Sequence, residues 1–205
     1  MKRQGAAEEL LRGLLAEFPH APALPRVHMQ MLPWQMVALY GLAWTKSRFC
    51  ERTGIRLLEI GTGHGSSAYM LAKAAPTAEI VSLTASVREG DLARTFLRGA
   101  VGDQVRVLPS RSLAYYAATV GQTWDLIYVD GDHRNCAKDL VWFNRLWDWG
   151  LILFHDYSPK ACPPVWDAVG VLGQSLGRAP DVELMDTNGI GMAGFYRKEG
   201  EQWPE

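Results

Sequence analysis

The chain has 205 residues, of which 48% are hydrophobic and 21% charged, with a net charge of −1. That length predicts one domain, residues 1–205, with a substantial core. The near-neutral balance excludes a general attraction to nucleic acid or to a membrane surface. Cys50, Cys136 and Cys162 are odd in number, far apart and without a CxxC pattern, so we expect free thiols. With no signal-peptide pattern and no apolar run of about 20 residues, we expect a cytoplasmic protein.

The first elements in chain order are helical. Residues 6–18 carry leucines and Phe18 at helical spacing, which predicts an amphipathic helix. Three prolines in FPHAPALPR end it, and Pro33 suits the first turn of a second helix that runs through Trp44. This second helix is apolar on nearly every side, so we expect it to be buried or to cover something. Residues 1–53 are therefore interpreted as an N-terminal helical cap.

An alternating pattern occupies the α/β core predicted for residues 54–198. Apolar β-like runs lie at 55–60, 79–84, 104–109, 124–130 and 150–156, with helical stretches near 66–75, 87–99, 111–120 and 135–147. This spacing predicts parallel strands with helices on both faces of one sheet, a Rossmann-like α/β fold. After a helix near 164–176, Asn188-Gly189 between two apolar runs predicts a C-terminal antiparallel hairpin.

A glycine-rich turn follows the first predicted strand in LLEIGTGHGSSAYMLA, residues 57–72. The glycines have the spacing GxGxG, and Ser66 stands where a pyrophosphate fingerprint, GxGxxG, has its third glycine. Glu59 precedes the turn and would repel a pyrophosphate, so an NAD or nucleotide-sugar enzyme is disfavoured. S-adenosylmethionine carries a sulfonium and an ammonium and no phosphate. We therefore expect Glu59 to help hold that cofactor, the alternative being a turn with no ligand.

Two stretches resemble a known family. LLEIGTGHGSS is similar to the first motif of class I S-adenosylmethionine-dependent methyltransferases. WDLIYVDGDHRNCAKDLVWFNRLWDWGLILFHDY resembles the small O-methyltransferase-like group with Asp-Gly-x-His after the fourth strand and His-Asp-Tyr after the fifth. The resemblance implies a seven-stranded sheet, bound S-adenosylmethionine and methyl transfer to a small molecule, with oxygen as the expected acceptor atom. In some relatives it also implies a divalent metal, Mg or Mn.

Carried over by motif, the cofactor-binding residues are expected to be Glu59, Gly61, Thr62, Gly63, His64, Gly65, Ser66, Ser67, Thr84, Arg111, Ser112 and Asp130. Two of these depart from the family pattern. Thr84 stands where relatives have an acidic residue that holds the ribose, and one hydroxyl cannot form a bidentate clamp. Arg111 replaces a usual acid beside Ser112, which is expected near the adenine. The Thr84 departure favours an alternative function, a cofactor- or nucleoside-binding module of the same fold without catalysis.

Acidic and histidine side chains follow the fourth and fifth predicted strands. If these strands are neighbours, Asp130 and Asp156 approach each other, and two such carboxylates repel unless a cation lies between them. Asp130, His133 and Asp156 are the predicted catalytic residues, with His133 as base or metal ligand. Asp130, His155 and Asp156 are the predicted metal ligands. Strand alternation nevertheless favours a His155 that points away from Asp156.

The sequence also predicts what this protein binds. We expect a small-molecule acceptor, with no nucleic acid and no membrane. Nothing in the sequence decides against a homo-oligomer.

Overall fold

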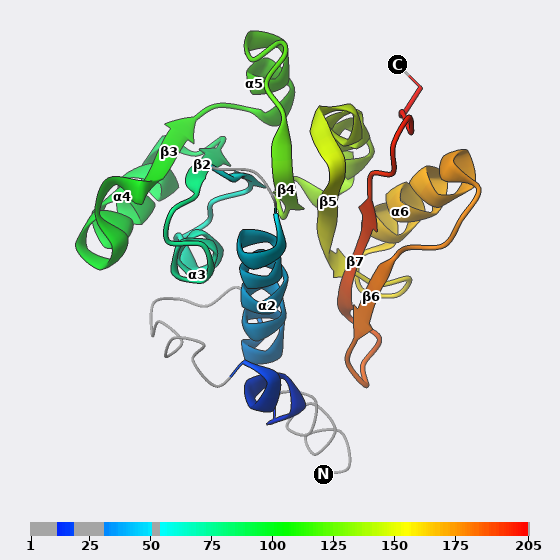
Figure 1. Ribbon diagram of the computed structural model, residues 1–205, viewed down its shortest axis with the longest axis horizontal. Coiled ribbons are helices and arrows are strands. Elements are labelled where there is room, and N and C mark those ends of the chain that lie inside the picture. Colours follow the sequence, from blue (N-terminus) through cyan, green and yellow to red (C-terminus); the bar gives the residue numbers. More distant parts are fainter. Residues whose placement is uncertain (1–11, 19–30, 51–53, 205) are drawn as a thin grey trace.

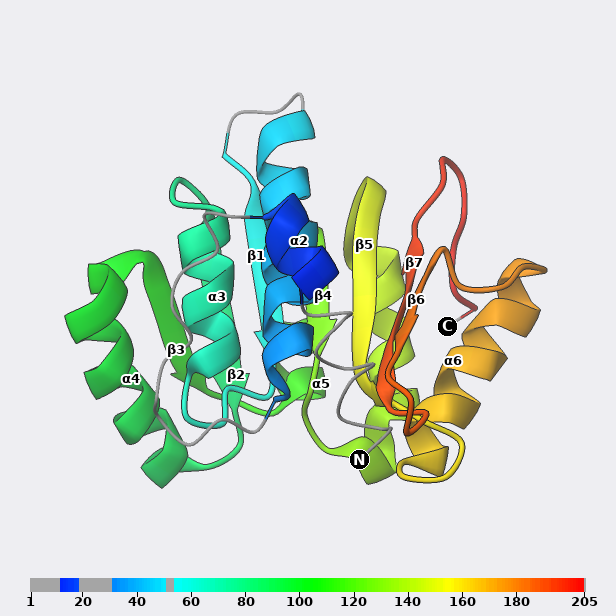
Figure 2. The ribbon, with the colours of Figure 1, turned by 90° about the horizontal axis from the view of Figure 1, so that it is seen from below.

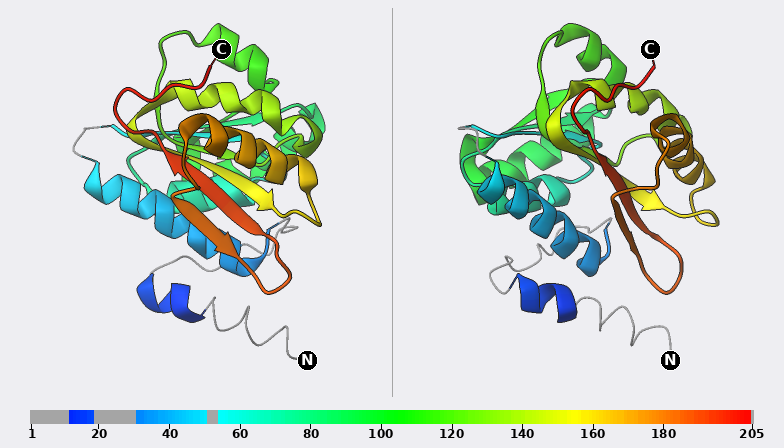
Figure 3. Two further views of the ribbon diagram at one scale, coloured as in Figure 1. Left: turned by 90° about the vertical axis from the view of Figure 1, so that its right-hand side faces the viewer. Right: turned by 45° about the vertical axis from the view of Figure 1, so that its right-hand side comes forward.

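The centre of the molecule is a seven-stranded sheet in the computed structural model, which describes residues 12–18, 31–50 and 54–204 (Figure 1). The strand order is β3-β2-β1-β4-β5-β7-β6. In chain order the strands are β1 (Arg56–Ile60), β2 (Glu79–Thr84), β3 (Val105–Pro109), β4 (Trp124–Val129), β5 (Leu146–Tyr157), β6 (Val182–Met185) and β7 (Gly191–Tyr196). Strands β1 to β5 run parallel, and β7 is antiparallel to β5 and β6. The predicted fold class is confirmed, including the terminal hairpin, which lies along β5 in Figure 3.

Helices cover both faces of this sheet (Figure 2). One face packs against α2 (Pro33–Phe49), α3 (Ser66–Ala74) and α4 (Val87–Val101). The other packs against α5 (Ser112–Ala118), the 3₁₀ helix η2 (His133–Arg145) and α6 (Pro163–Leu176). A short 3₁₀ turn, η1 (Gly102–Gln104), leads into β3. Because side chains alternate along a strand, Leu57 points into the first layer and Leu58 into the second, and both are fully buried.

The α2 helix belongs to the first of these two layers. Trp34, Met36 and Leu39 are almost fully buried and pack in the same cluster as the side chains of β1 and α3. Of the helix predicted at 6–18, residues 12–17 are helical, and residues 6–11 lie outside the described residues. None of the helices in the described part of the chain combines the length and the apolarity needed to cross a bilayer.

The start of β5 differs from the sequence prediction, which placed residues 146 and 147 in a helix and began the strand at 150. Leu146 already pairs with Trp124, and Leu151 then pairs with Leu126, so four residues of β5 oppose one residue of β4. Within this bulge Trp149 has a φ of 64°, and its side chain is exposed. A bulge of this kind cannot be read from hydrophobic periodicity, because the exposed residues interrupt the apolar run.

Candidate functional site

The turn after β1 lies directly against the turn after β4. The Asp130 backbone N–H donates to the Ile60 carbonyl at 2.8 Å. Gly61 has a φ of 105°, and a Cβ atom at this position would lie 2.0 Å from the Asp130 carbonyl oxygen. Only glycine combines that backbone conformation with so close an approach. The glycine turn therefore brings the predicted cofactor loop next to Asp130.

Glu59 lies beneath this loop and is fully buried. The Ser82 hydroxyl on β2 donates to the Glu59 carboxylate, and the Ser82 and Thr62 hydroxyl oxygens are 2.7 Å apart. Burial raises the pKa of Glu59 to about 8, against hydrogen bonds from Ser67 and Ser82 that lower it. The network thus ties β1 and β2 to the loop from below, and the acid is protonated at neutral pH until a cationic partner changes that balance.

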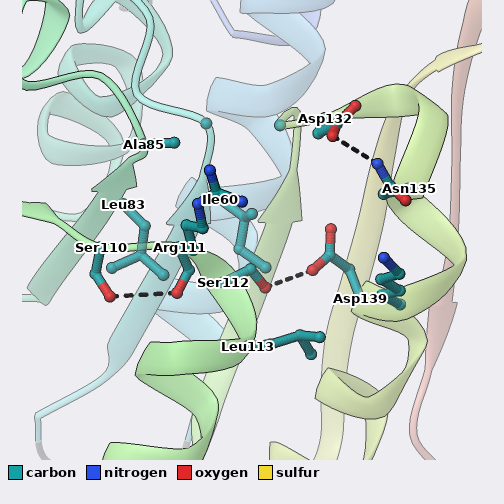
Figure 4. Close-up of a pocket in the computed structure, with 13 residues that line it drawn as sticks. Ile60, Leu83, Ala85, Ser110, Arg111, Ser112, Leu113, Asp132, Asn135 and Asp139 are labelled. Atoms are coloured by element: carbon teal, nitrogen blue, oxygen red, sulfur yellow. Dashed lines mark hydrogen bonds between the residues drawn. The ribbon is translucent and has the colours of Figure 1, made fainter.

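Two cavities meet at Gly61. The first has a volume of about 330 Å³ and opens between the end of β2, the start of α5 and η2 (Figure 4). Its wall includes the apolar Ile60, Leu83 and Leu113 and the polar Ser112. The second cavity, about 10 Å³, is lined by Met31, Gly61, Thr62, His64, Ser66, Ser67 and Asp130. A nucleoside fits the volume of the first cavity, whereas the second has room for about one water molecule.

The predicted cofactor residues divide accordingly. Gly61, Arg111 and Ser112 line the first cavity, and Thr62, His64, Ser66, Ser67 and Asp130 line the second with Gly61. Gly63 and Gly65 both have positive φ, and Gly65 is the N-cap of α3, so these two shape the turn. Thr84 lines neither cavity. Its hydroxyl bonds the Ser86 carbonyl and amide, each at 3.1 Å, while Leu83 and Ala85 on either side face the first cavity.

Thr84 gives a first testable prediction. We expect Thr84→Asp to tighten the binding of S-adenosylhomocysteine about tenfold, because one carboxylate oxygen can keep the Ser86 amide while the second accepts from a ribose hydroxyl. Isothermal titration calorimetry measures the change, with Thr84→Asn as the uncharged control of similar shape. Weaker binding by the aspartate variant would mean that the contact with Ser86 is the role of this side chain.

Four side chains gather at the ends of β4 and β5, next to the second cavity. Asp130, His133, His155 and Asp156 each offer one ligand atom, and these atoms lie within 4.8 Å of one another. His155 Nδ1 is 3.0 Å from Asp130 Oδ1 and 3.3 Å from Asp156 Oδ1. His133 Nε2 is 3.4 Å from Asp130 Oδ1 and 3.6 Å from Asp156 Oδ2. The two acids are therefore bridged by two imidazoles, and we call these four residues the tetrad.

The expectation that His155 points away from Asp156 is wrong. Asp156 has a φ of 54°, in the left-handed region, and the pairing of β5 with β7 shifts between Phe154 and Tyr157. This irregularity breaks the alternation of side chains and turns both residues toward Asp130. A non-glycine residue in this region is strained by about 1–2 kcal/mol, so the surrounding structure holds it there.

The pKa values of the tetrad residues depend on one another. Burial opposes the charge on Asp130, but hydrogen bonds from His133 and His155 outweigh it and hold the pKa of that acid below its ordinary value. Burial likewise opposes a charged His155, and the bonds to Asp130 and Asp156 overcome it and raise the pKa of His155 to about 10. The hydrogen bond to Asp130 is the main reason that the pKa of His133 is raised. The carboxylate pair, for which the sequence predicted a cation, thus has the protonated imidazole of His155 beside it.

The donor set nevertheless suits a divalent metal. Two carboxylates and two imidazoles are ligands that Mn²⁺ or Zn²⁺ accepts more readily than Mg²⁺ does. His155 faces both acids through Nδ1, whereas its Nε2 is buried and has no hydrogen-bond partner in the described part of the chain. The tetrad is therefore a candidate metal centre as well as a candidate acid–base cluster.

Three residues at the site did not emerge from the sequence. Ser82 supports Glu59, Met31 lines the second cavity, and Asp139 lines the first and accepts a hydrogen bond from Ser112. A signal existed for Asp139, since it is an acid placed directly before the apolar run LVWF and three residues after Cys136, at the spacing of one helix face. Ser82 carried no signal, because a serine within a strand predicts nothing by itself.

Comparison with known proteins shows which proteins this site resembles. Residues 58–157, which include both the glycine turn and the tetrad, match the family model described as a methyltransferase domain. This part of the chain is similar to a methyltransferase domain. The match runs from Leu58 within β1 to Tyr157 at the end of β5, and the terminal hairpin completes the seven-stranded sheet.

The chain is also similar to one curated protein and to several solved structures. A catechol O-methyltransferase of Mycobacterium tuberculosis is 33% identical over 103 residues, covering 49% of this chain and 47% of the relative. The chain thus spans about half the length of the curated relative that it matches. The solved structure of cofactor-bound Rv0187 from MTB is 25% identical with a TM-score of 0.65, covering 93% of this chain and 91% of that one. An O-methyltransferase from Bacillus cereus in complex with SAH is similar in fold, at 20% identity and a TM-score of 0.64, covering 94% and 91%.

Proposed function

We propose that this chain transfers the methyl group of S-adenosylmethionine to an oxygen atom of a small molecule. The observation that carries the proposal is the position of Asp130, which lines the second cavity beside the glycine turn and is also a member of the tetrad. A cofactor held by the glycine turn and an acceptor held by the tetrad would therefore meet at one residue. The matched catechol O-methyltransferase supports oxygen as the acceptor atom and a catechol as the first compound to test.

The residues have separate roles in this proposal. The first cavity would hold the nucleoside, and the loop from Gly61 to Ser67 would hold the methionine part. S-adenosylmethionine supplies an activated methyl group, so the chain has to position the acceptor oxygen in line with it and remove the proton of the hydroxyl. Positioning can supply several kcal/mol and a base about 10²–10⁴-fold in rate. His133, whose side chain is 34% exposed, is the more accessible of the two histidines in the tetrad and would take that proton in its neutral form.

We further propose that the tetrad binds a divalent metal through Asp130, His155 and Asp156, with His133 at its edge. When bound, a metal would orient the acceptor and lower the pKa of its hydroxyl. A single domain over residues 1–205, a cytoplasmic location and the absence of nucleic-acid and membrane partners stay proposals from the sequence.

Calorimetry with S-adenosylmethionine, S-adenosylhomocysteine and NAD tests the proposed cofactor. We expect the first two to bind and NAD not to bind. Turnover of a panel of catechols with labelled S-adenosylmethionine then tests the reaction, before and after dialysis against EDTA and after addition of Mg²⁺, Mn²⁺ or Zn²⁺. Full activity in EDTA would eliminate the metal and leave His133 as the base. Cofactor binding without turnover of any acceptor would favour a binding module, and failure to bind the cofactor would refute the proposal.

A further inference from the structure

Ser112 at the start of α5 has a hydroxyl whose direction is determined by its neighbours. Its oxygen accepts from the Trp142 indole N–H at 2.7 Å and donates to the Asp139 carboxylate. An indole N–H can only donate, and the hydroxyl has a single proton, so that proton is committed to Asp139. Ser112 therefore has no proton left for a ligand, although it lines the first cavity.

Asp139 is a charged side chain in this wall that keeps a free acceptor position. The residue is 6% exposed and lines the first cavity from η2, opposite the start of α5. Its Oδ1 receives the Ser112 hydroxyl, and Figure 4 shows the second oxygen directed away from Ser112. Beside it, Ile60, Leu83 and Leu113 provide apolar surface for a flat ring. An apolar slot with one carboxylate oxygen at its edge suits a heteroaromatic ring that carries an N–H donor.

We propose that Asp139 accepts a hydrogen bond from the exocyclic amine of the cofactor's adenine and so makes this cavity selective for an aminopurine over an oxopurine. The assignment rests on the proposed function. An ionised carboxylate can only accept, so it pairs with the amine of adenine and repels the carbonyl oxygen of hypoxanthine. Ser112 is then a positioning residue that holds the carboxylate in place, with Trp142 behind it.

The charge state of Asp139 gives this selectivity a pH dependence. Burial raises the pKa of Asp139 to about 6, with Asp132 raising it further and Ser112 and Lys138 lowering it. Arg111 lines the same cavity from the N-terminus of α5. Above this pKa the carboxylate accepts from the amine, and below it the protonated acid can donate to a carbonyl oxygen. The preference for adenine should therefore rise as pH rises through about 6.

The experiment compares the affinities of S-adenosylhomocysteine and its deaminated analogue, S-inosylhomocysteine, by calorimetry near neutral pH. We expect the unaltered protein to prefer the adenosyl compound by at least about tenfold. Asp139→Asn should reduce that preference to roughly threefold or less, because an amide can present either its N–H or its oxygen. Ser112→Ala, which keeps the carboxylate but removes the hydroxyl that holds it, should lower the preference less than Asp139→Asn does.

Three outcomes would overturn the assignment. The first is the same preference in Asp139→Asn as in the unaltered protein, and the second is a loss of preference in Ser112→Ala alone. If thermal unfolding shows that Asp139→Asn does not fold, the assignment is tested instead by the pH dependence of the preference in the unaltered protein. The third outcome is a ratio of affinities for the adenosyl and inosyl compounds that does not change between about pH 5 and about pH 7.5. Binding of neither compound at any pH would instead refute the proposed function.

Discussion

Exchange of Asp130 for asparagine should lower the rate of methyl transfer at least about a hundredfold. Asp130 Oδ1 lies within 3.4 Å of both His133 and His155, so the amide removes the charge that orients both rings. His155 is almost fully buried, and without its charged partner it loses the interaction that offsets its desolvation. Turnover of an acceptor found in the catechol panel measures the effect, with S-adenosylhomocysteine affinity expected to fall by no more than about tenfold.

Two further variants make this test specific. Asp156→Asn should lower the rate to a similar degree, since Asp156 contacts the same two histidines. Asp148→Asn changes an acid on the same strand, outside the tetrad and with a side chain 52% exposed, and should leave the rate within about twofold of the original. Unchanged turnover in both the Asp130 and the Asp156 variants would rule out the acidic floor proposed for the acceptor.

Replacement of Glu59 should weaken S-adenosylmethionine binding at least about tenfold, whether the new residue is alanine or glutamine. Glutamine keeps the shape and the hydrogen bond from Ser82 and removes only the capacity for negative charge, whereas alanine also removes the support beneath Thr62. If alanine weakens binding and glutamine does not, Glu59 acts by holding the loop and not by pairing with the charge of the cofactor. Unchanged affinity in both variants would contradict any cofactor role for this acid.

The glutamine variant should also change how stability depends on pH. The pKa of Glu59 is about 8 in the folded protein against an ordinary value of 4.5, so folding favours the protonated acid. Its contribution is complete below the ordinary value and is lost as pH rises toward the folded value, at about 1.4 kcal/mol per pH unit. Glu59→Gln removes this loss. Without ligand, the variant should melt higher than the original protein at about pH 8 and at a similar temperature at about pH 5, as measured by differential scanning calorimetry.

The order of elements followed from local pattern. Strands β1 to β4 begin and end within about one residue of the predicted runs. Three of them, β1, β2 and β4, are buried on both faces, and such a strand is a short apolar segment between turn residues. Asn188-Gly189 marked the hairpin for a similarly local reason, since Gly189 takes the positive φ that the turn requires. The glycine spacing after β1 and the acids after β4 and β5 could be assigned to one edge of the sheet, because parallel strands share their carboxyl ends.

Contacts that depend on a particular side-chain direction were decided only in the tertiary structure. The positive φ of Asp156 turns His155 into the tetrad, against the alternation that a regular strand would impose. Thr84 turns toward Ser86, two residues away, and Asp139 meets Ser112 across 27 positions of chain. Periodicity reports which face of an element is apolar, and motif spacing reports which turns approach one another. Neither reports where one polar group finds its partner, because that depends on bulges and on packing between elements distant in sequence.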